Sequence, residues 1–353
     1  MRVSVHWLLA AAPIALWLEH TEAPAPAIFA AAALALIPLA SLIVHSTEQI
    51  ALRTSPSVGG LLNATFGNLP ELIIAVTALR AGLTDMVRGS LIGALLANLL
   101  LAQGLSFLLG GRKRHEQEFN PAGARTYTSM MLLTALCLAV PAAFHRFFSD
   151  RAESPGESLD VGIAILLLAV YVLYLVFMLR SHADFFARSG KSSHAEGPQW
   201  SATRAASTLV LASVGAAWTS EMLVGAAQAT GGALGMSDLF LGIVVLAVLG
   251  GAAELGAAVA MARKDEMDLS VGIAMGSSIQ IGLFVTPVLV LVSGFFQSGR
   301  RSLSFSRLEM GVLLCSVLVG TVVAGDGRTN WFKGVQLLAL YVVIAAVLYL
   351  LPS

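Results

Sequence analysis

The feature that most restricts the fold of this chain is a succession of apolar stretches, each long enough to cross a lipid bilayer. A transmembrane helix needs about 20 predominantly apolar residues, and because lipid cannot hydrogen-bond to the backbone, each stretch must be helical. We count eleven stretches, at residues 3–18, 26–52, 58–81, 86–110, 126–148, 159–180, 202–232, 238–262, 267–294, 303–324 and 331–350. The sequence therefore predicts an all-α integral membrane protein with eleven transmembrane helices.

Composition agrees with this prediction and excludes other classes of protein. Hydrophobic residues make up 57% of the 353 residues and charged residues only 12%, whereas a soluble domain carries about 25% charged residues. The 21 basic side chains balance 21 acidic ones without a long basic tract, so we expect no nucleic-acid partner. Cys137 and Cys315 both lie in apolar runs and indicate neither a disulfide nor a metal site. The expected partner is the lipid bilayer.

The cationic side chains predict the orientation of the chain. With the N-terminus inside, 14 of the 21 Lys and Arg residues fall on the inner side, so the positive-inside rule places the N-terminus in the cytoplasm and the C-terminus outside. The first stretch has a second interpretation, because Arg2, an apolar run and small residues also resemble a cleavable signal peptide. Pro13 within the run and Glu19 at its end favour a retained helix. We expect a multi-pass protein of a bacterial inner membrane; nothing in the sequence specifies its oligomeric state.

The chain repeats itself at an offset of 183 residues. Residues 67–93 and 250–276 align without a gap over 27 positions, of which nine are identical. The identities include Glu71, Arg80 and Asp85, which a shared apolar composition alone would not align. The two segments therefore indicate an internal duplication.

This duplication divides the predicted helices into one N-terminal helix and two repeats of five. The predicted parts are an N-terminal transmembrane helix at 1–25, a first repeat at 26–180, a cytoplasmic linker at 181–201 and a second repeat at 202–353. Because five is odd, the second repeat crosses the membrane upside down relative to the first. In transporters with such inverted repeats, ion sites lie near the bilayer midplane, where broken helices of both halves meet.

Two acidic side chains, Glu71 and Glu254, fall near the middle of predicted helices at equivalent places in the two repeats. A charge at the bilayer centre costs roughly 2.5 kcal/mol or more, so such residues usually face the protein interior and mark an ion path. The structural alternative is a protonated Glu bonded to a backbone carbonyl. Two glutamates related by an inverted repeat favour the functional interpretation.

Helix-breaking residues come before each of these glutamates. Gly67 loosens the predicted helix 58–81. Because Pro70 has no N–H group, the carbonyl of Phe66 is free to turn toward a ligand. Asn68 adds an amide oxygen one turn before Glu71, on the same face. The first predicted break therefore supplies both carbonyl and amide oxygen atoms.

In the second repeat, Gly250 and Gly251 provide the predicted break. The assembled donors are oxygen atoms only, which suit a hard cation such as Ca²⁺ better than Zn²⁺ or Cu²⁺. Two neighbouring carboxylates in a site of low dielectric constant must be neutralised by a divalent cation or by protons. The sequence therefore predicts exchange of Ca²⁺ for H⁺ as transported ions, with no cofactor.

Other polar residues are candidates for the ion path. Glu48 and Glu221 lie one helix before the central glutamates, where they could attract cations at the two mouths or bond neighbouring helices; both interpretations stay open. Amides and hydroxyls on two later helices could serve as ligands, as a proton relay or as contacts between helices. These residues are Asn98, Ser277, Ser278 and Gln280.

The residues around both glutamates resemble the cation/proton exchangers of the Ca²⁺:cation antiporter superfamily. The segments 47–54 and 59–71, the latter including GGLLNATFGN, resemble the family's first conserved repeat. The run 221–226, Glu254 and the segment 267–281 resemble the second conserved repeat. The similarity covers about residues 41–111 and 205–295, and the rest fits the family's plan of eleven helices.

The resemblance implies export of cytoplasmic Ca²⁺ driven by inward movement of H⁺. It implies that Glu71 and Glu254 bind cation and proton in turn, and that Glu48 and Glu221 line the access routes. The chain departs from the family at Gly251, where the second repeat normally has Asn. This difference removes one amide ligand from the predicted site.

Three other functions are alternatives to exchange of Ca²⁺ for H⁺. The same fold could be driven by Na⁺ or move another cation, although sodium exchangers of the superfamily tend to place hydroxyl residues where Asn68 and Gly251 occur. A passive cation channel is a further alternative, against which broken helices in inverted repeats favour alternating access. An enzyme is not supported, because the Gly325-Asp326-Gly327 fragment of a protease-like motif lies in a predicted loop and all seven histidines fall at helix ends or in loops.

Overall fold

The computed structural model describes residues 5–148, 156–182, 200–295 and 305–350, which are mostly helical. The prediction of an all-α protein is confirmed. In the first half, the elements are η1 (Val5–Ala10), α1 (Ala11–His20), α2 (Ala25–Ala51), α3 (Pro56–Phe66), α4 (Leu69–Arg80), α5 (Thr84–Leu96), η2 (Ala97–Ala102), α6 (Gln103–Gly111), β1 (Gln117–Glu118), α7 (Pro121–Phe148), α8 (Gly156–Val176) and η3 (Phe177–Ser181). In the second half, they are α10 (Ala202–Leu234), α11 (Asp238–Phe240), η4 (Leu241–Leu246), α12 (Ala247–Gly250), α13 (Ala252–Arg263), α14 (Met267–Gln280), η5 (Ile281–Val285), α15 (Thr286–Ser293), α16 (Arg307–Ala324), β2 (Arg328–Thr329) and α17 (Trp331–Leu350).

The helices establish a multi-pass membrane protein. Within the described residues, eight helices are long and apolar enough to span a bilayer, and a ninth span results if the bent pair Asp238–Gly250 and Ala252–Arg263 is taken as one. Two predicted spans differ from the expectation. The first stretch forms a short apolar helix, Trp7–His20, and the stretch 58–81 is divided into α3 and α4. The count of eleven spans therefore stays a prediction.

The chain forms two compact units, and each takes segments from both predicted repeats. The first unit comprises Met1–Gly93, His194–Ala253 and Val347–Ser353, and the second comprises Ala94–Ser193 and Glu254–Ala346. Most of the predicted linker at 181–201 lies outside the described residues. The predicted limits of the repeats stay a prediction.

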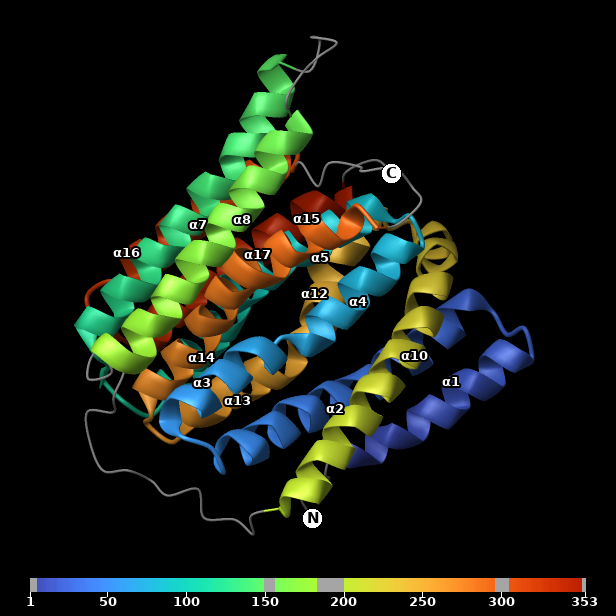
Figure 1. Ribbon diagram of the computed structural model, residues 1–353, viewed down its shortest axis with the longest axis horizontal. Helices are drawn as coiled ribbons and strands as arrows, with labels where there is room; N and C mark the ends of the chain where they lie inside the picture. The colour runs from blue at the N-terminus through green and yellow to red at the C-terminus, as the bar shows by residue number, and fades with distance from the viewer. Residues whose placement is uncertain (1–4, 149–155, 183–199, 296–304, 351–353) are drawn as a thin grey trace. The chain divides into compact units, whose positions relative to one another are not determined.

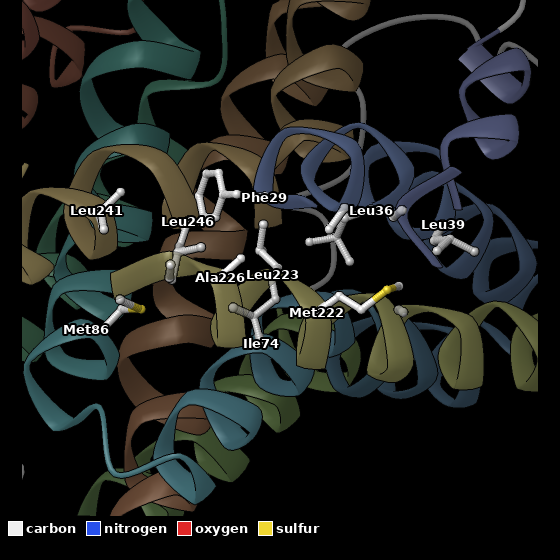
Figure 2. Close-up of a cluster of buried hydrophobic side chains, with 14 of the residues drawn as sticks. Phe29, Leu36, Leu39, Ile74, Met86, Met222, Leu223, Ala226, Leu241 and Leu246 are labelled. Carbon is white, nitrogen blue, oxygen red and sulfur yellow. The ribbon is translucent and has the colours of Figure 1, made fainter. Parts of the chain in front are cut away.

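Apolar side chains hold the first unit together. The long helix α2 packs against both α1 and α10, and α10 also packs against α4 (Figure 1). Leu36 of α2, Ile74 of α4 and Leu223 of α10 belong to one buried cluster, which Figure 2 shows between these helices. Burial of the cluster fixes α4, the helix on which Glu71 lies, against α10.

In the second unit, α7 packs against α8, α14 and α16 (Figure 1). Three connections meet at one end of this unit: the α6–α7 segment, the α13–α14 turn and the α16–α17 turn. Strand β1 of the α6–α7 segment pairs with strand β2 of the α16–α17 turn as a two-stranded antiparallel sheet. The side chain of Gln117, also in the α6–α7 segment, donates a hydrogen bond of 3.2 Å to the carbonyl of Ala262 beside the α13–α14 turn. The predicted topology places all three connections on the same side of the membrane, in agreement with this arrangement.

The duplication is visible in the element boundaries. Helices α4 (Leu69–Arg80) and α13 (Ala252–Arg263) each contain 12 residues, and both their first and last residues are 183 positions apart. Helices α5 and α14 also begin 183 positions apart, and each continues into a π-helical segment, η2 and η5. The offset found in the sequence therefore recurs in the local backbone structure.

Close helix approach at Gly93 gives a first test of the packing. A Cβ atom on Gly93 would lie 2.1 Å from the carbonyl oxygen of Ile243, whereas one on Gly225 would meet no atom of the described chain within 4 Å. Overpacking costs about 1–3 kcal/mol, so we expect Gly93→Ala to lower the apparent Tm by roughly 2–10 °C. Thermal unfolding of the purified protein in detergent measures the shift. Gly225→Ala is the matched control, and equal Tm values for the two variants would contradict the packing described here.

Candidate cation site

The first helix break lies between α3 and α4. Helix α3 ends at Phe66, α4 begins at Leu69, and Asn68 between them has φ −99° and ψ 24°, outside the helical range. Pro70 is the second residue of α4, where a missing N–H group is tolerated. The break expected from Gly67 and Pro70 is thus present. It leaves the carbonyl of Phe66 without the N–H partner that residue 70 would normally supply.

Glu71 is the third residue of α4 and lies in its first turn. Glu71 is only 8% exposed, and neither of its carboxylate oxygens has a hydrogen-bond partner among the residues that the structure describes. Asn68, directly before the helix, is 2% exposed. A buried polar group without a partner is unfavourable and rare in native structures, so a charged group or ion is the expected partner of this carboxylate.

Gly250 packs directly against the Glu71 side chain. A Cβ atom on Gly250 would lie 3.2 Å from Cγ and 3.7 Å from Cδ of Glu71, and 3.5 Å from Cδ1 of Ile74. All three residues belong to the first unit. The structure therefore brings together two predicted site residues that are 179 positions apart, and the backbone of α12 lines the Glu71 carboxylate.

The second helix break repeats the geometry of the first. Helix α12 ends at Gly250, α13 begins at Ala252, and the apolar pair is bent by 58°. Gly251 has φ −82° and ψ 13°, close to the values at Asn68, its equivalent in the first repeat. Glu254 is the third residue of α13, as Glu71 is of α4, and it is also 8% exposed. Glu254 belongs to the second unit, so its approach to Glu71 stays a prediction.

Polar side chains of the second unit partly pair with one another. The amide Nδ2 of Asn98 donates to Oγ of Ser277 over 3.0 Å, and both residues are buried. Ser278 donates its hydroxyl to the carbonyl of Ala274, four residues earlier in its own helix, over 3.0 Å. Gln280 is half-buried. The structure therefore brings Asn98 and Ser277 together, whereas the proton of the Ser278 hydroxyl is used within α14.

A further buried amide, Gln103, lies on the same predicted helix as Asn98 and has no assigned role in the predicted site. Gln103 is 1% exposed, and its side-chain oxygen and nitrogen have no hydrogen-bond partner in the described part of the chain. It follows Asn98 by five residues, the hydrogen-bond spacing of the π-helical segment η2 between them. In the sequence it stands out as an uncharged amide in an apolar stretch, five residues after another.

The two outer glutamates are exposed and each has a basic neighbour. Oε2 of Glu48 lies 3.6 Å from Nδ1 of His45 on the same helix. Oε1 of Glu221 lies 3.6 Å from Nη1 of Arg80, an ion pair that joins α10 to α4. Glu221 therefore bonds the helix that carries Glu71, and a role at the mouth of a path stays a prediction for both residues.

Asp326 of the protease-like fragment has a structural explanation. It lies in the turn between α16 and α17, and the ammonium of Lys333 donates to its two carboxylate oxygens over 2.9 and 2.7 Å. Partial burial favours the protonated acid, but hydrogen bonds from Lys333 and from the backbone N–H of Arg328 outweigh it and lower the pKa of Asp326. The carboxylate thus serves as an ion-pair partner that holds the turn.

In the described part of the chain, histidine, cysteine and acidic side chains alone do not form a metal centre. Among the described residues, no group of three or more His, Cys, Asp or Glu side chains is placed to hold a metal ion. Near Glu71, the amide of Asn68 and the backbone of both helix breaks carry further oxygen atoms. Ligands of that kind are typical of hard cations.

Known proteins are similar to this chain over most of its length. A family model described as "Sodium/calcium exchanger protein" matches the chain twice, at residues 24–180 and 204–350. The Ca(2+)/H(+) antiporter of Synechocystis is 37% identical over 369 residues, covering 99% of this chain and 94% of that protein. The Ca(2+)/H(+) antiporter ChaA of Bacillus subtilis is 39% identical over 332 residues, covering 93% of each.

Solved structures include similar folds. The structure of native YfkE has a TM-score of 0.85 and 35% sequence identity, and the match covers 99% of this chain and 100% of that one. Both the sequence matches and this structural match extend over nearly the whole chain. The chain belongs to the sodium/calcium exchanger protein family.

Proposed function

We propose that this protein is a secondary antiporter of a bacterial inner membrane that exports cytoplasmic Ca²⁺ in exchange for H⁺. The observation that carries the proposal is Glu71, a buried carboxylate in the first turn of α4 that packs against Gly250 at the second helix break. The relatives from Synechocystis and Bacillus subtilis, both named Ca²⁺/H⁺ antiporters, support this choice of ions. Family membership indicates a transporter rather than an enzyme.

In this proposal, oxygen atoms alone bind the cation. The ligands are the carboxylates of Glu71 and Glu254, the amide of Asn68 and backbone carbonyls of Phe66, Gly67, Gly250 and Gly251. Ca²⁺ accepts about 6–8 oxygen ligands in flexible arrangements, which carboxylates and loosened helix ends can supply. The first turn of each broken helix also faces the ligand with free N–H groups, which moderate the charge of an empty site.

Charge neutrality couples the two transported ions. Two carboxylates that share a site of low dielectric constant are neutralised either by one Ca²⁺ or by protons. A carrier that crosses the membrane with Ca²⁺ in one direction and with protons in the other never exposes the bare pair of charges. Alternating access to the two sides then converts a proton gradient into export of Ca²⁺.

The proposed architecture is one N-terminal helix followed by two inverted repeats of five helices, with the N-terminus in the cytoplasm and the C-terminus outside. The equal lengths and offset of α4 and α13 support the repeat, as does the double match of one family model. In such a plan the two helix breaks meet near the midplane, and Glu71 and Glu254 face each other. Glu48 and Glu221 line the access routes, and Asn98, Ser277, Ser278 and Gln280 line the path.

The first prediction about transport concerns the two central glutamates. We expect Glu71→Gln or Glu254→Gln to abolish Ca²⁺ transport, because a neutral amide can neither balance Ca²⁺ nor carry a proton. Glu48→Gln should only weaken transport, because Glu48 attracts the ion without binding it at the centre. Uptake of Ca²⁺ into everted vesicles or proteoliposomes under an imposed pH gradient measures these effects.

The same assay separates the proposal from its alternatives. A Na⁺ gradient in place of the pH gradient is the control, and uptake driven by Na⁺ alone would indicate a sodium-driven exchanger. Ca²⁺ flux that is independent of both gradients would indicate a channel. Flux like that of the wild type in either central variant would refute the assigned site.

The second prediction concerns the contact between Gly250 and Glu71. Gly250→Ala places a methyl group 3.2 Å from Cγ of Glu71, so the carboxylate must move away from α12. We expect the KM for Ca²⁺ to rise about three- to tenfold, equivalent to about 0.7–1.4 kcal/mol of binding free energy. Gly256→Ala is the matched control, since a methyl group there meets no described atom within 4 Å. Equal KM values in the two variants would argue against a cation bound at this contact.

The third prediction concerns the missing amide of the second repeat. Gly251 has nearly the backbone conformation of Asn68, so asparagine there needs no unusual φ and ψ angles. We expect Gly251→Asn to lower the KM for Ca²⁺, because it adds a ligand that the first repeat already has. Gly251→Ala adds a Cβ without an amide and should not lower the KM. Measured KM values that fall equally in both variants would assign the effect to helix stabilisation instead.

A further inference from the structure

A network of polar contacts fixes the end of α13 that lies opposite Glu254. The side-chain Nε2 of Gln117 donates to Oδ1 of Asp265 over 2.6 Å and to the carbonyl of Ala262 over 3.2 Å. Nε of Arg114 lies 3.3 Å from the same carboxylate oxygen of Asp265. We call Arg114, Gln117 and Asp265 the loop clasp, and all its members belong to the second unit.

The neighbouring elements extend this network. Asp268, at the start of α14, accepts the backbone N–H of Asn120 over 2.6 Å. Strand β1, which contains Gln117, pairs with β2, and Arg328 of β2 lies 3.4 Å from the carboxylate of Glu118. The C-terminal end of α13 is therefore connected through the loop clasp to the segments before α7 and α17.

The close fit of Gln117 supports a specific contact. Gln117 is 2% exposed, although it lies in a connecting segment. A Cβ atom on Gly110, at the end of α6, would lie 2.6 Å from Oε1 of Gln117 and 2.8 Å from the carbonyl oxygen of Ala262. Glycine at position 110 thus gives the Gln117 side chain room to reach α13.

The backbone at Asp265 has a conformation in which glycine is usual. Asp265 has φ +69°, in the left-handed region that favours glycine. The equivalent residue of the first repeat is Gly82, with φ +78°. The turns match in their hydrogen bonds: Gly82 N–H donates to the carbonyl of Leu79 over 3.0 Å, and Asp265 N–H donates to that of Ala262 over 3.1 Å.

The two turns share a backbone conformation but differ in whether a side chain is present. Glycine suffices for this type of helix end, and Asp tolerates it only with some strain. A Cβ atom on Gly82 would meet no described atom within 4 Å, whereas the Asp265 side chain contacts Gln117 and Arg114. The second repeat therefore has a side chain where the first has open space, and this side chain anchors α13.

We propose that Asp265 is a positioning residue that holds Glu254 in place through α13, an inference that rests on the proposed function. Helix α13 has 12 residues, about 18 Å of rigid rod, and Glu254 lies at the end that follows the break at Gly251. Because the break loosens one end of the rod, the clasp at the other end fixes its direction. Glu254 is thereby held to the second unit, whereas α4 has no clasp at Gly82 among the described residues.

Transport by the full-length protein in proteoliposomes tests the proposal. Asp265→Gly keeps the turn, relieves its strain and removes the clasp, so we expect the KM for Ca²⁺ to rise about three- to tenfold with the maximal velocity within about twofold of wild type. Asp265→Asn keeps the acceptor oxygen and should restore a KM within about twofold of wild type. Gly82→Asn, which places an amide in the unclasped turn of the first repeat, is the matched control and should leave the KM unchanged.

Several outcomes would overturn the proposal. An unchanged KM in Asp265→Gly, or a fall in maximal velocity alone, would assign Asp265 a merely structural role. An equal rise of the KM in Gly82→Asn would show that any change at these turns has the same effect.

A second measurement remains informative if the wild-type protein proves not to transport Ca²⁺. Amide hydrogen exchange across residues 252–263 of the purified protein reports the anchoring of α13 directly. We expect exchange to be about tenfold faster in Asp265→Gly than in Asp265→Asn. Equal exchange in the two variants would disprove the clasp, whereas absence of Ca²⁺ flux in the wild type would disprove only the proposed function.

Discussion

The constraint on which the structure depends is that backbone polar groups inside a bilayer must find partners within the protein or in a bound ion. Continuous helices satisfy this condition by themselves, and a break does not. The chain interrupts its helices at Asn68 and at Gly251, and a buried glutamate follows each break by three residues. In transporters such breaks persist where the freed groups line a site, and this is the physical basis of the cation site proposed here.

Local features of the fold could be predicted from the sequence because they depend on local chemistry. Apolar runs locate the helices, and the duplication at an offset of 183 residues correctly relates the ends of α4 and α13. Glu71 lies near the middle of the stretch 58–81, and because that stretch is divided, it falls in the first turn of α4. Pro70 suits the first turn of the new helix, where its missing N–H group is tolerated.

The contacts between distant segments could not be predicted in the same way. Asn98 bonds Ser277, and Gln117 bonds Asp265, across 179 and 148 positions of the sequence. The helical period indicates which face of a helix is buried, but the partner on that face depends on how the helices pack. The contact between Gly250 and Glu71 could not be predicted either. A glycine leaves space where a Cβ would be, but the sequence does not show which side chain fills that space.

The differences between the repeats are as informative as their identities. The duplicated backbone is nearly the same at the two breaks and at the two turns that end α4 and α13. Its side chains have diverged in opposite directions: Asn68 corresponds to Gly251 at the break, whereas Gly82 corresponds to Asp265 at the turn. The first repeat thus has the extra amide at the break and the second has the extra anchor. A transporter whose two halves shared every contact would anchor both broken helices in the same way, whereas here the two halves differ at the break and at the turn.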